Sequence, residues 1–321
     1  MDVIALGELL IDFTDAGIGE NGMRLFEQNP GGAPANVLAA LSRLGKKTAF
    51  IGKVGNDMHG RFLRQTLAEN GIDTSSLILD DDVFTTLAFV KLSAGEREFS
   101  FARKPGADTC LREDELDDDA IKEAKVFHFG SLSLTDEPAR SATTAAIGKA
   151  KASGAIISYD PNYRATLWPG VDVAKAQMTS VLPLVDIMKF SDEEAALLTD
   201  RSEPEAALDY LLDIGIKIPV LTLGAEGALV ATREGKRLVP TRKSRVVDTT
   251  GAGDSFWGGF LCSLIDSGLG TDRKPLDISL SEAVEAARMG NAVAGLCIEK
   301  RGAIPAMPTK AEVEARLAQQ F

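Results

Sequence analysis

Histidine and cysteine are scarce in this chain of 321 residues, which contains two histidines and three cysteines. Cys110, Cys262 and Cys297 form no Cys-x-x-Cys pair, and no His-Glu-x-x-His motif occurs. These gaps argue against a zinc site and a thiol redox centre. A Ser-His-Asp triad could use only His59 or His128, and we expect His128, which lies between two phenylalanines, to be a packed strand residue. The chemistry is therefore expected to use carboxylates, backbone amides, lysine and arginine.

Positive charge is also in short supply. Lysine and arginine total 35 against 47 aspartates and glutamates, so the formal net charge is −12. This balance argues against nucleic acid and anionic membrane as partners, and an anionic substrate would need a local positive pocket. No apolar run is long enough to span a bilayer. The first residues lack a basic region and are typical of a strand instead of a signal peptide, and free cysteines fit a reducing cytoplasm.

No internal repeat, low-complexity tract or proline-rich linker divides the sequence, although its length would allow one large domain or two. Apolar runs of strand length alternate with helical stretches, which predicts an α/β fold with a mainly parallel sheet covered by helices. The expected strands are 3–10, 48–54, 126–129, 155–159, 185–190 and 220–223, and the expected helices include 35–44, 60–69, 280–296 and 309–319. Ligand groups should gather beyond the carboxyl ends of the strands.

Two stretches interrupt this order, residues 12–30 and residues 85–101. The second consists of two runs that flank a turn at Ser93 to Glu96, and this pattern predicts a β-hairpin. Neither stretch has the helical period of its neighbours. We therefore expect both to form a small sheet that stands off the main one, within a single discontinuous domain over residues 1–321.

Gly17, Gly19 and Gly22 match the Gly-x-Gly-x-x-Gly pattern of dinucleotide-binding proteins. In those proteins a helix opens at the third glycine, whereas residues 23–28 here soon meet Asn-Pro-Gly-Gly, which breaks helices. The pattern therefore favours a flexible turn, and a dehydrogenase would require the chain to bind NAD. No P-loop motif occurs either.

A second glycine-containing run, VDTTGAGDSF from Val247 to Phe256, leads into an apolar stretch. Its glycines allow a tight turn that presents amides at a helix start, where phosphate oxygens bind. The carboxylate of Asp254 would repel an anion, but it could accept a proton from an attacking hydroxyl. The alternative is an ordinary first-turn aspartate that complements the helix dipole.

The surrounding motifs resemble the ribokinase-like (PfkB) family of carbohydrate kinases, and within it the fructokinases. DTTGAGDSF is similar to the family's carboxyl-terminal signature, and GGAPANV at residues 31–37 is similar to its amino-terminal signature. Further matches are GELLIDF from residue 7, FARKPGAD from 101, FHFGSLSL from 127, YDPNYRATLW from 159, TLGAEGALV from 222 and KRGAIP from 300. Their order along the whole chain is the family's order. The resemblance implies a three-layer α/β/α sandwich with a β-sheet lid formed by about residues 12–30 and 84–104.

In these kinases the aspartate of the final signature is the general base. The resemblance therefore implies that Asp254 takes the proton of the sugar hydroxyl that attacks the γ-phosphoryl group of ATP. The amides of Gly251, Ala252, Gly253 and Asp254 would form the anion hole. Arg164 would add a cation near the transferring phosphate.

For the sugar, Asp12, Gly32 and Asn36 match family positions that bind hydroxyl groups. For Asn36 alone, a helix cap is the ordinary interpretation. Phe101 and Arg103 lie on the predicted hairpin, which in family members closes over the sugar and excludes water.

The resemblance places the nucleotide along Thr222, Gly224 and Gly227, with Asn291 near the adenine. A glycine turn between any two strands would show the same pattern as the first three residues.

For metal ions the chain departs from the family's Asn-x-x-Glu motif and has Ser191-Asp-Glu-Glu194, a variant also found among fructokinases. Glu194 is expected to hold Mg²⁺ through water, and the roles of Ser191 and Asp192 stay open. Asp248 and Thr250 match positions that hold a potassium ion in activated family members.

The expected reaction is phosphorylation of D-fructose at O6 by ATP. Ribokinases usually have a lysine after the glycine pair, where this chain has Ala33 and Pro34. A 2-keto-3-deoxygluconate kinase shares much of the pattern and is the alternative, with Arg103 or Arg164 as the partner of the acid. A sugar-binding regulator that has lost catalysis is a third interpretation. Family members often dimerise through the lid, which leaves a homodimer open here.

Overall fold

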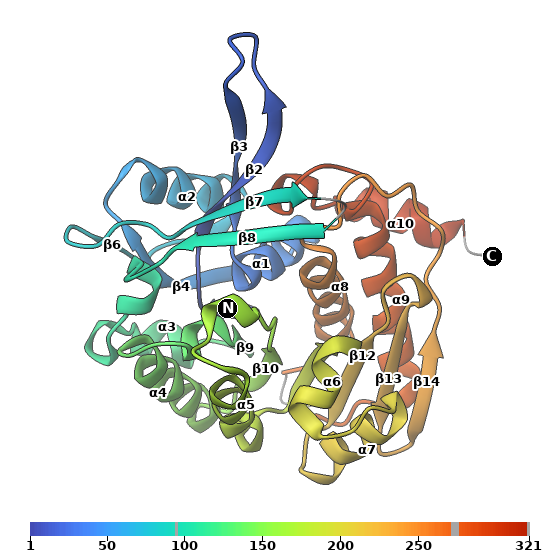
Figure 1. Cartoon of the computed structure of the whole chain (residues 1–321). Coiled ribbons are helices and arrows are strands. Elements are labelled where there is room, and N and C mark those ends of the chain that lie inside the picture. The colour runs from blue at the N-terminus through green and yellow to red at the C-terminus, as the bar shows by residue number, and fades with distance from the viewer. Residues whose placement is uncertain (94–95, 271–275, 320–321) are drawn as a thin grey trace.

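The computed structural model describes residues 1–93, 96–270 and 276–319, and it contains a large sheet covered by helices with a second sheet beside it (Figure 1). The large sheet has ten strands in the order β14-β13-β12-β11-β10-β9-β1-β4-β5, with β6 paired to β4. Neighbouring strands are parallel from β5 to β12 and antiparallel from β12 to β14. The strands are β1 (Val3–Leu6), β4 (Thr48–Gly55), β5 (Ile72–Asp73), β6 (Leu77–Asp80), β9 (Val126–Gly130), β10 (Ile156–Asp160), β11 (Ile187–Ser191), β12 (Ile218–Thr222), β13 (Ala228–Thr232) and β14 (Gly235–Val239). The predicted, mainly parallel α/β sheet is confirmed.

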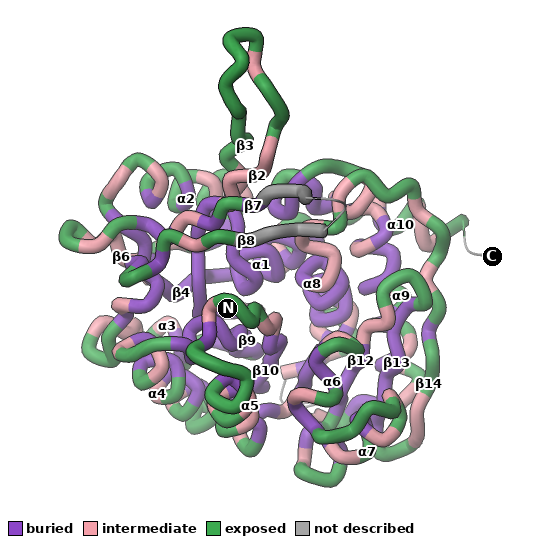
Figure 2. The backbone as a smooth tube through the Cα atoms, viewed as in Figure 1, coloured by how far each residue is buried: buried purple, intermediate pink, exposed green. Residues whose placement is uncertain are grey.

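Helices cover both faces of this sheet because its strands send alternate side chains into two cores. In β1, Val3 and Ala5 belong to the first core, while Ile4 and Leu6 belong to the second. The first core is completed by α1 (Ala33–Arg43), α2 (Met58–Glu69), α8 (Ala252–Asp266), α9 (Leu280–Cys297) and α10 (Lys310–Ala318). The second is completed by α3 (Asp118–Lys122), α4 (Ala139–Ala152), α5 (Val171–Ser180), α6 (Asp192–Thr199) and α7 (Pro204–Asp213). Figure 2 shows these buried layers in purple.

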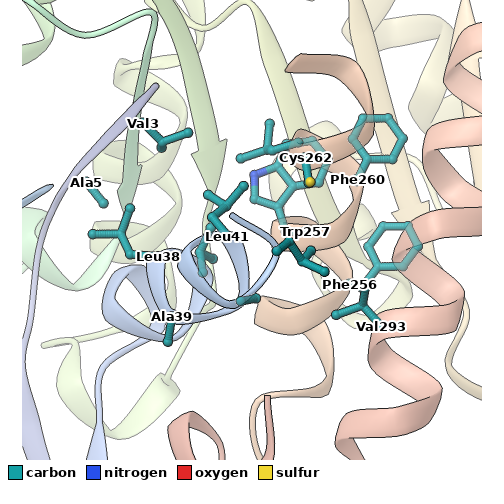
Figure 3. Packing of buried hydrophobic residues seen from close by; sticks show 14 of the residues in the cluster. Val3, Ala5, Leu38, Ala39, Leu41, Phe256, Trp257, Phe260, Cys262 and Val293 are labelled. Carbon is teal, nitrogen blue, oxygen red and sulfur yellow. The ribbon is translucent and has the colours of Figure 1, made fainter. Parts of the chain in front are cut away.

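The first core contains the start of the glycine-containing signature helix, α8. Figure 3 shows its Trp257 near Leu41 of α1 and its Phe256 near Val293 of α9, all in one buried cluster. The rings of Trp257 and Phe260 stack with centroids 4.9 Å apart. Helix α8 is thus fixed on both sides, which holds its first turn in place.

A short buried polar chain links this helix to the sheet. The indole nitrogen of Trp257 donates to the hydroxyl of Ser158 at 2.9 Å, and Nδ1 of His128 lies 3.0 Å from the same hydroxyl. Burial is the main cause that lowers the pKa of His128 to about 4, so the imidazole is neutral near pH 7. His128 is the packed strand residue that the sequence predicts.

The second sheet has the order β3-β2-β7-β8. It consists of β2 (Leu10–Ile18), β3 (Arg24–Gly31), β7 (Leu87–Ser93) and β8 (Glu96–Ala102). The β2–β3 hairpin projects from the body, and β7 and β8 cross above the central sheet (Figure 1). Antiparallel pairing of β7 with β8 confirms the predicted hairpin, although Ala94 and Gly95 of its turn lie outside the described residues.

The Gly-x-Gly-x-x-Gly pattern lies at the tip of the projecting hairpin. Gly17 and Gly22 have φ angles of 89° and 73°, and β3 follows where a dinucleotide-binding protein would have a helix. The predicted turn is confirmed. The three cysteines are unpaired, and no helix in the described part of the chain is both long and apolar enough to cross a membrane.

The prediction of one strand over residues 3–10 is wrong. β1 ends at Leu6, and β2 of the second sheet begins at Leu10. The apolar run does not change at this junction because residues on both sides of it are buried, so hydrophobicity gives no sign of the change of sheet. Glu8, which is 2% exposed, marks the junction.

Candidate active site

A cavity of ≈ 320 Å³ lies at the carboxyl ends of the central strands, and the second sheet contributes to its wall. The starts of α1 and α8 also border it. Many of the residues singled out in the sequence line it together: Asp12, Gly32, Asn36, Phe101, Arg164, Asp248, Thr250, Gly251, Ala252, Gly253 and Asp254. Segments from both ends of the chain therefore meet at one site, where open α/β sheets bind their ligands.

The start of α8 forms one side of this cavity. Gly251 is its N-cap with φ 74°, a left-handed conformation, and a Cβ there would lie 2.7 Å from the Cβ of Ala303. No side chain caps this helix. The amide of Ala252 donates to the carbonyl of Thr249 at 3.2 Å, and within the described residues no acceptor is found for the amides of Gly253 and Asp254. These two amides, with the positive end of the helix dipole, can bind an anion.

Asp254 lies in the first turn of α8 and is 8% exposed. Its Oδ2 accepts a hydrogen bond of 2.8 Å from Nδ2 of Asn36. Burial is the largest cause that raises the pKa of Asp254 to about 6, and the carboxylate of Asp160 adds to it, whereas Lys189, Asn36 and Arg164 lower it. The carboxyl is mostly ionised at pH 7 and can accept a proton.

Lys189, which the sequence reasoning missed, lies beside this turn. It is on β11, is 6% exposed and lines the cavity. Its Nζ donates to Oδ2 of Asp160 at 2.7 Å, and a Cβ built on Gly253 would lie 2.9 Å from the same Nζ. A lysine within the otherwise apolar run 187–190 is the sequence signal that could have found it, because buried charges need a partner.

The start of α1 also borders the cavity. Gly32 has φ 119°, and a Cβ there would lie 2.3 Å from the carbonyl oxygen of Glu8. The amide of Ala33 donates to Oε1 of Glu8 at 2.8 Å, so a carboxyl of the protein occupies this helix start. Asn36 follows one turn later and lies 5% exposed. The carboxyl of Glu8, the side-chain amide of Asn36 and the backbone of Gly32 lie around one turn, and together such groups can bind several hydroxyl groups.

Asp248 and Thr250 lie in the segment that leads into α8. Oδ1 of Asp248 accepts from the amide and the hydroxyl of Thr250 at 3.0 and 2.7 Å, and its Oδ2 accepts from the amide of Gly302 at 3.0 Å. The structure thus joins the predicted potassium residues to each other and to the 300–305 motif.

Arg103 is not brought to the cavity. Its guanidinium is buried, pairs with Asp108 at 2.7 Å, and donates to the hydroxyl of Thr135 and the carbonyl of Leu132. Asp108 follows Arg103 by only five residues, so this ion pair is local to the base of the hairpin. The predicted sugar contact of Arg103 is therefore not supported by its place in the structure. Phe101, on β8, does line the cavity.

The residues predicted for the nucleotide, Thr222, Gly224, Gly227 and Asn291, lie around the β12–β14 edge and line no part of this cavity. Nδ2 of Asn291 donates to the carbonyls of Val239 and Pro240 at 3.0 and 3.3 Å, which ties α9 to β14. A contact with adenine would therefore use its Oδ1.

Glu194, predicted to hold Mg²⁺, closes the start of α6. Its Oε1 accepts from the amide of Tyr163 at 2.7 Å, and its Oε2 accepts from the amide of Ser191 at 2.8 Å. Burial, followed by the charge of Asp160, raises its pKa. No group of three histidine, cysteine, aspartate or glutamate side chains that could hold a metal occurs in the described residues. The donor set fits a cation bound mainly by other oxygens and through water, as Mg²⁺ often is.

The fold and the site define a class of protein. A three-layer α/β sandwich carries a buried carboxylate beside open helix-start amides and two cations, Arg164 and Lys189. Phosphoryl transfer depends on this combination of proton acceptor, anion binding and charge neutralisation.

Comparison with known proteins identifies the family. The chain matches the pfkB family carbohydrate kinase over residues 2–310. It is 44% identical over 320 residues to probable fructokinase-4 of Arabidopsis thaliana. This alignment covers 98% of this chain and 96% of that protein. It is similar to a fructokinase from Xylella fastidiosa with bound ATP, with a TM-score of 0.92 and 34% identity over 99% of this chain and 98% of that chain. A fructokinase double mutant from Vibrio cholerae O395, in a form with fructose, ADP and potassium ion bound, gives a TM-score of 0.88 and 34% identity with the same coverage. The chain belongs to the pfkB family of carbohydrate kinases, as its motifs predict.

Proposed function

We propose that this kinase transfers the γ-phosphoryl group of ATP to O6 of D-fructose, with Asp254 as general base. The observation that carries the proposal is the buried carboxylate of Asp254, hydrogen-bonded to Asn36 and next to the open amides of α8. Asp254 takes the proton of the 6-hydroxyl while O6 forms a bond to the γ-phosphorus and the bond to the ADP oxygen breaks. The fructokinases among its relatives support the choice of sugar.

Neutralisation of the phosphates is needed because the chain carries a net charge of −12. The amides of Gly253 and Asp254 and the guanidinium of Arg164 supply positive charge at the phosphate end of the cavity. Thr222, Gly224, Gly227 and Asn291 bind the nucleotide along the β12–β14 edge. Glu194 would hold Mg²⁺ through water, and the ion would neutralise phosphate charge there. Asp248 and Thr250 would hold a potassium ion.

The charges around the cavity favour a neutral sugar over a sugar acid. Three carboxylates of the second sheet, Asp12, Asp15 and Glu27, line it. Arg301 also lines it but pairs with Glu27 at 3.2 Å, and Arg103 is buried elsewhere. Asp15 pairs with Arg24, so the cations on this side are already engaged by carboxylates, and the carboxylate of 2-keto-3-deoxygluconate would have to compete with them for a partner.

The second sheet acts as a lid over the sugar, within one discontinuous domain, and covers the reacting atoms from water. Its exposed apolar side chains also favour a homodimer through this sheet. They are Ile18, Met23, Leu25, Phe26 and Phe89. Light scattering tests this: the wild-type chain should have twice the monomer mass, and the double variant Leu25→Lys with Phe26→Lys should have the mass of one monomer.

A coupled ADP-release assay across fructose, ribose, 2-keto-3-deoxygluconate and nucleosides tests the function. Fructose is expected to give the highest kcat/KM. A higher value for 2-keto-3-deoxygluconate would make the chain a sugar acid kinase, and binding of fructose without ADP release would make it a sugar-binding regulator.

A further inference from the structure

Lys189 is a buried cation beside the start of α8 to which the proposed reaction assigns no step of its own. It occupies β11 at a position where its Nζ lies against Gly253, the second residue of the helix. A Cβ on Gly253 would approach this Nζ to 2.9 Å and the Cε to 3.4 Å. The glycine therefore leaves room for the ammonium directly beside the anion-binding turn.

Three carboxylates from three elements surround this ammonium. Asp160, at the end of β10, accepts its hydrogen bond at 2.7 Å, while Glu194 of α6 and Asp254 of α8 interact with it through their charges. Although burial alone would lower the pKa of Lys189, these carboxylates raise it, so the lysine stays charged. One fixed positive charge is thus shared among three acids.

The sharing has a consequence for Asp254. Asp160 and Asp254 are close enough that the charge of Asp160 opposes ionisation of Asp254, and Lys189 counters that effect. Oδ1 of Asp160 has no hydrogen-bond partner among the described residues, so its charge is compensated mainly by Lys189. Without the ammonium, two neighbouring carboxylates would compete for ionisation, as paired carboxylates do.

We propose that Lys189, oriented by Asp160, is a positioning residue that keeps the Asp254 carboxylate ionised and supports the anion-binding turn at Gly253. The proposal rests on the proposed role of Asp254 as the base. Lys189 acts on the proton acceptor and not on the sugar, so its loss changes the pH at which the enzyme works more than the affinity for the sugar.

Two substitutions shift the acid limb of the kcat/KM profile in opposite directions. Lys189→Met removes the cation that lowers the pKa of Asp254, so the limb should move to higher pH by about one unit or more, a tenfold loss at a fixed acidic pH. Asp160→Asn removes the carboxylate that raises this pKa, so the limb should move to lower pH. The measurement is ADP release with fructose from pH 5 to pH 9.

Lys53→Met is the matched control. Lys53 is 2% exposed and pairs with Glu115 at 2.7 Å and Asp80 at 3.3 Å, in a buried ion pair that does not line the cavity. It should lose stability like Lys189→Met and leave the acid limb unmoved. If Lys189→Met fails to fold, Lys189→Gln takes its place: it also removes the cation but keeps a donor for Asp160, and an unmoved acid limb in this variant would overturn the role of Lys189.

The outcomes separate this proposal from the function on which it rests. If the wild type phosphorylates none of the sugars, or Asp254→Asn keeps full turnover, the proposed function fails. If both of those tests succeed but the limbs of Lys189→Met and Asp160→Asn coincide with that of the wild type, the role of Lys189 is overturned.

Discussion

Two helix starts border the cavity and are joined by the hydrogen bond between Asn36 and Asp254, but they differ in what occupies their amides. At α1 the amide of Ala33 is taken by the carboxyl of Glu8, whereas at α8 no side chain caps the helix, and Gly253 and Asp254 line the cavity with amides that have no acceptor among the described residues. A helix start whose amide already donates to a protein carboxyl has no free donor there for an anion, whereas an open helix start attracts one. The difference agrees with the proposed division of the site, in which the sugar binds near α1 and phosphate binds at α8.

Asp254→Asn at the open start should have the largest effect. Loss of the proton acceptor is expected to reduce kcat by about 10² to 10⁴ while affinity for ATP and fructose stays near that of the wild type. Kinetics combined with calorimetric titration checks this. Full turnover in the variant would show that another group accepts the proton.

Glu8→Gln at the closed start should act on stability instead. Burial is the main cause that raises the pKa of Glu8 to about 7 from 4.5, so the folded state holds a proton that the unfolded state has lost. Stability from this group is complete below about pH 4.5 and is lost as the pH rises through 7. The glutamine variant should therefore be more stable than the wild type at pH 8, by up to about 3 kcal/mol. Urea unfolding at pH 5 and pH 8 measures it, and an unchanged pH dependence would contradict the cause.

Gly32→Ala tests the backbone of the closed start. The φ of 119° and a contact of 2.3 Å with the carbonyl of Glu8 predict a loss of roughly 1–3 kcal/mol or more in unfolding free energy, with a higher KM for fructose. Gly154→Ala is the control, because Gly154 has φ 84° but no atom within 4 Å of its Cβ position. Gly154→Ala should lower the unfolding free energy less than Gly32→Ala does. Equal losses in the two variants would show that the contact with Glu8 is unimportant.

Ser279→Ala should give the smallest effect, at a helix start away from the cavity. Ser279 caps α9 and accepts from the amide of Glu282 at 3.3 Å in a capping box. Removal of the hydroxyl should cost about 1 kcal/mol of stability and leave kcat and KM unchanged. A loss of activity would mean that the stability of α9 affects the geometry of the active-site cavity.

The motifs predicted the fold and the catalytic turn because they combine local backbone requirements with ordered spacing. Gly251 and Gly32 adopt positive φ angles that side chains disfavour, and such positions leave a trace in the sequence. The role of Asp254 as base is still a prediction, although the structure places it in the cavity. The exchange of sheets after Leu6 left no trace, because burial continues on both sides.

Partners that are distant in sequence were harder to foresee. Lys189 meets Asp160 through the parallel register of neighbouring strands, which no local pattern encodes. Arg103 was assigned to the sugar from its place on the hairpin, but Asp108 and Thr135 hold it in the protein interior. Whether a charged side chain reaches a cavity depends on its tertiary partners, not on its element.

The buried indole beneath the active turn gives the protein an internal optical probe. Trp257 is one of two tryptophans in the chain, follows Asp254 by three residues on the same helix, and donates to Ser158. Side chains three apart share a helix face, so a change in the first turn of α8 is felt at the next turn. In a Trp168→Phe background, the fluorescence of the native enzyme would report events at the phosphate side without any attached label.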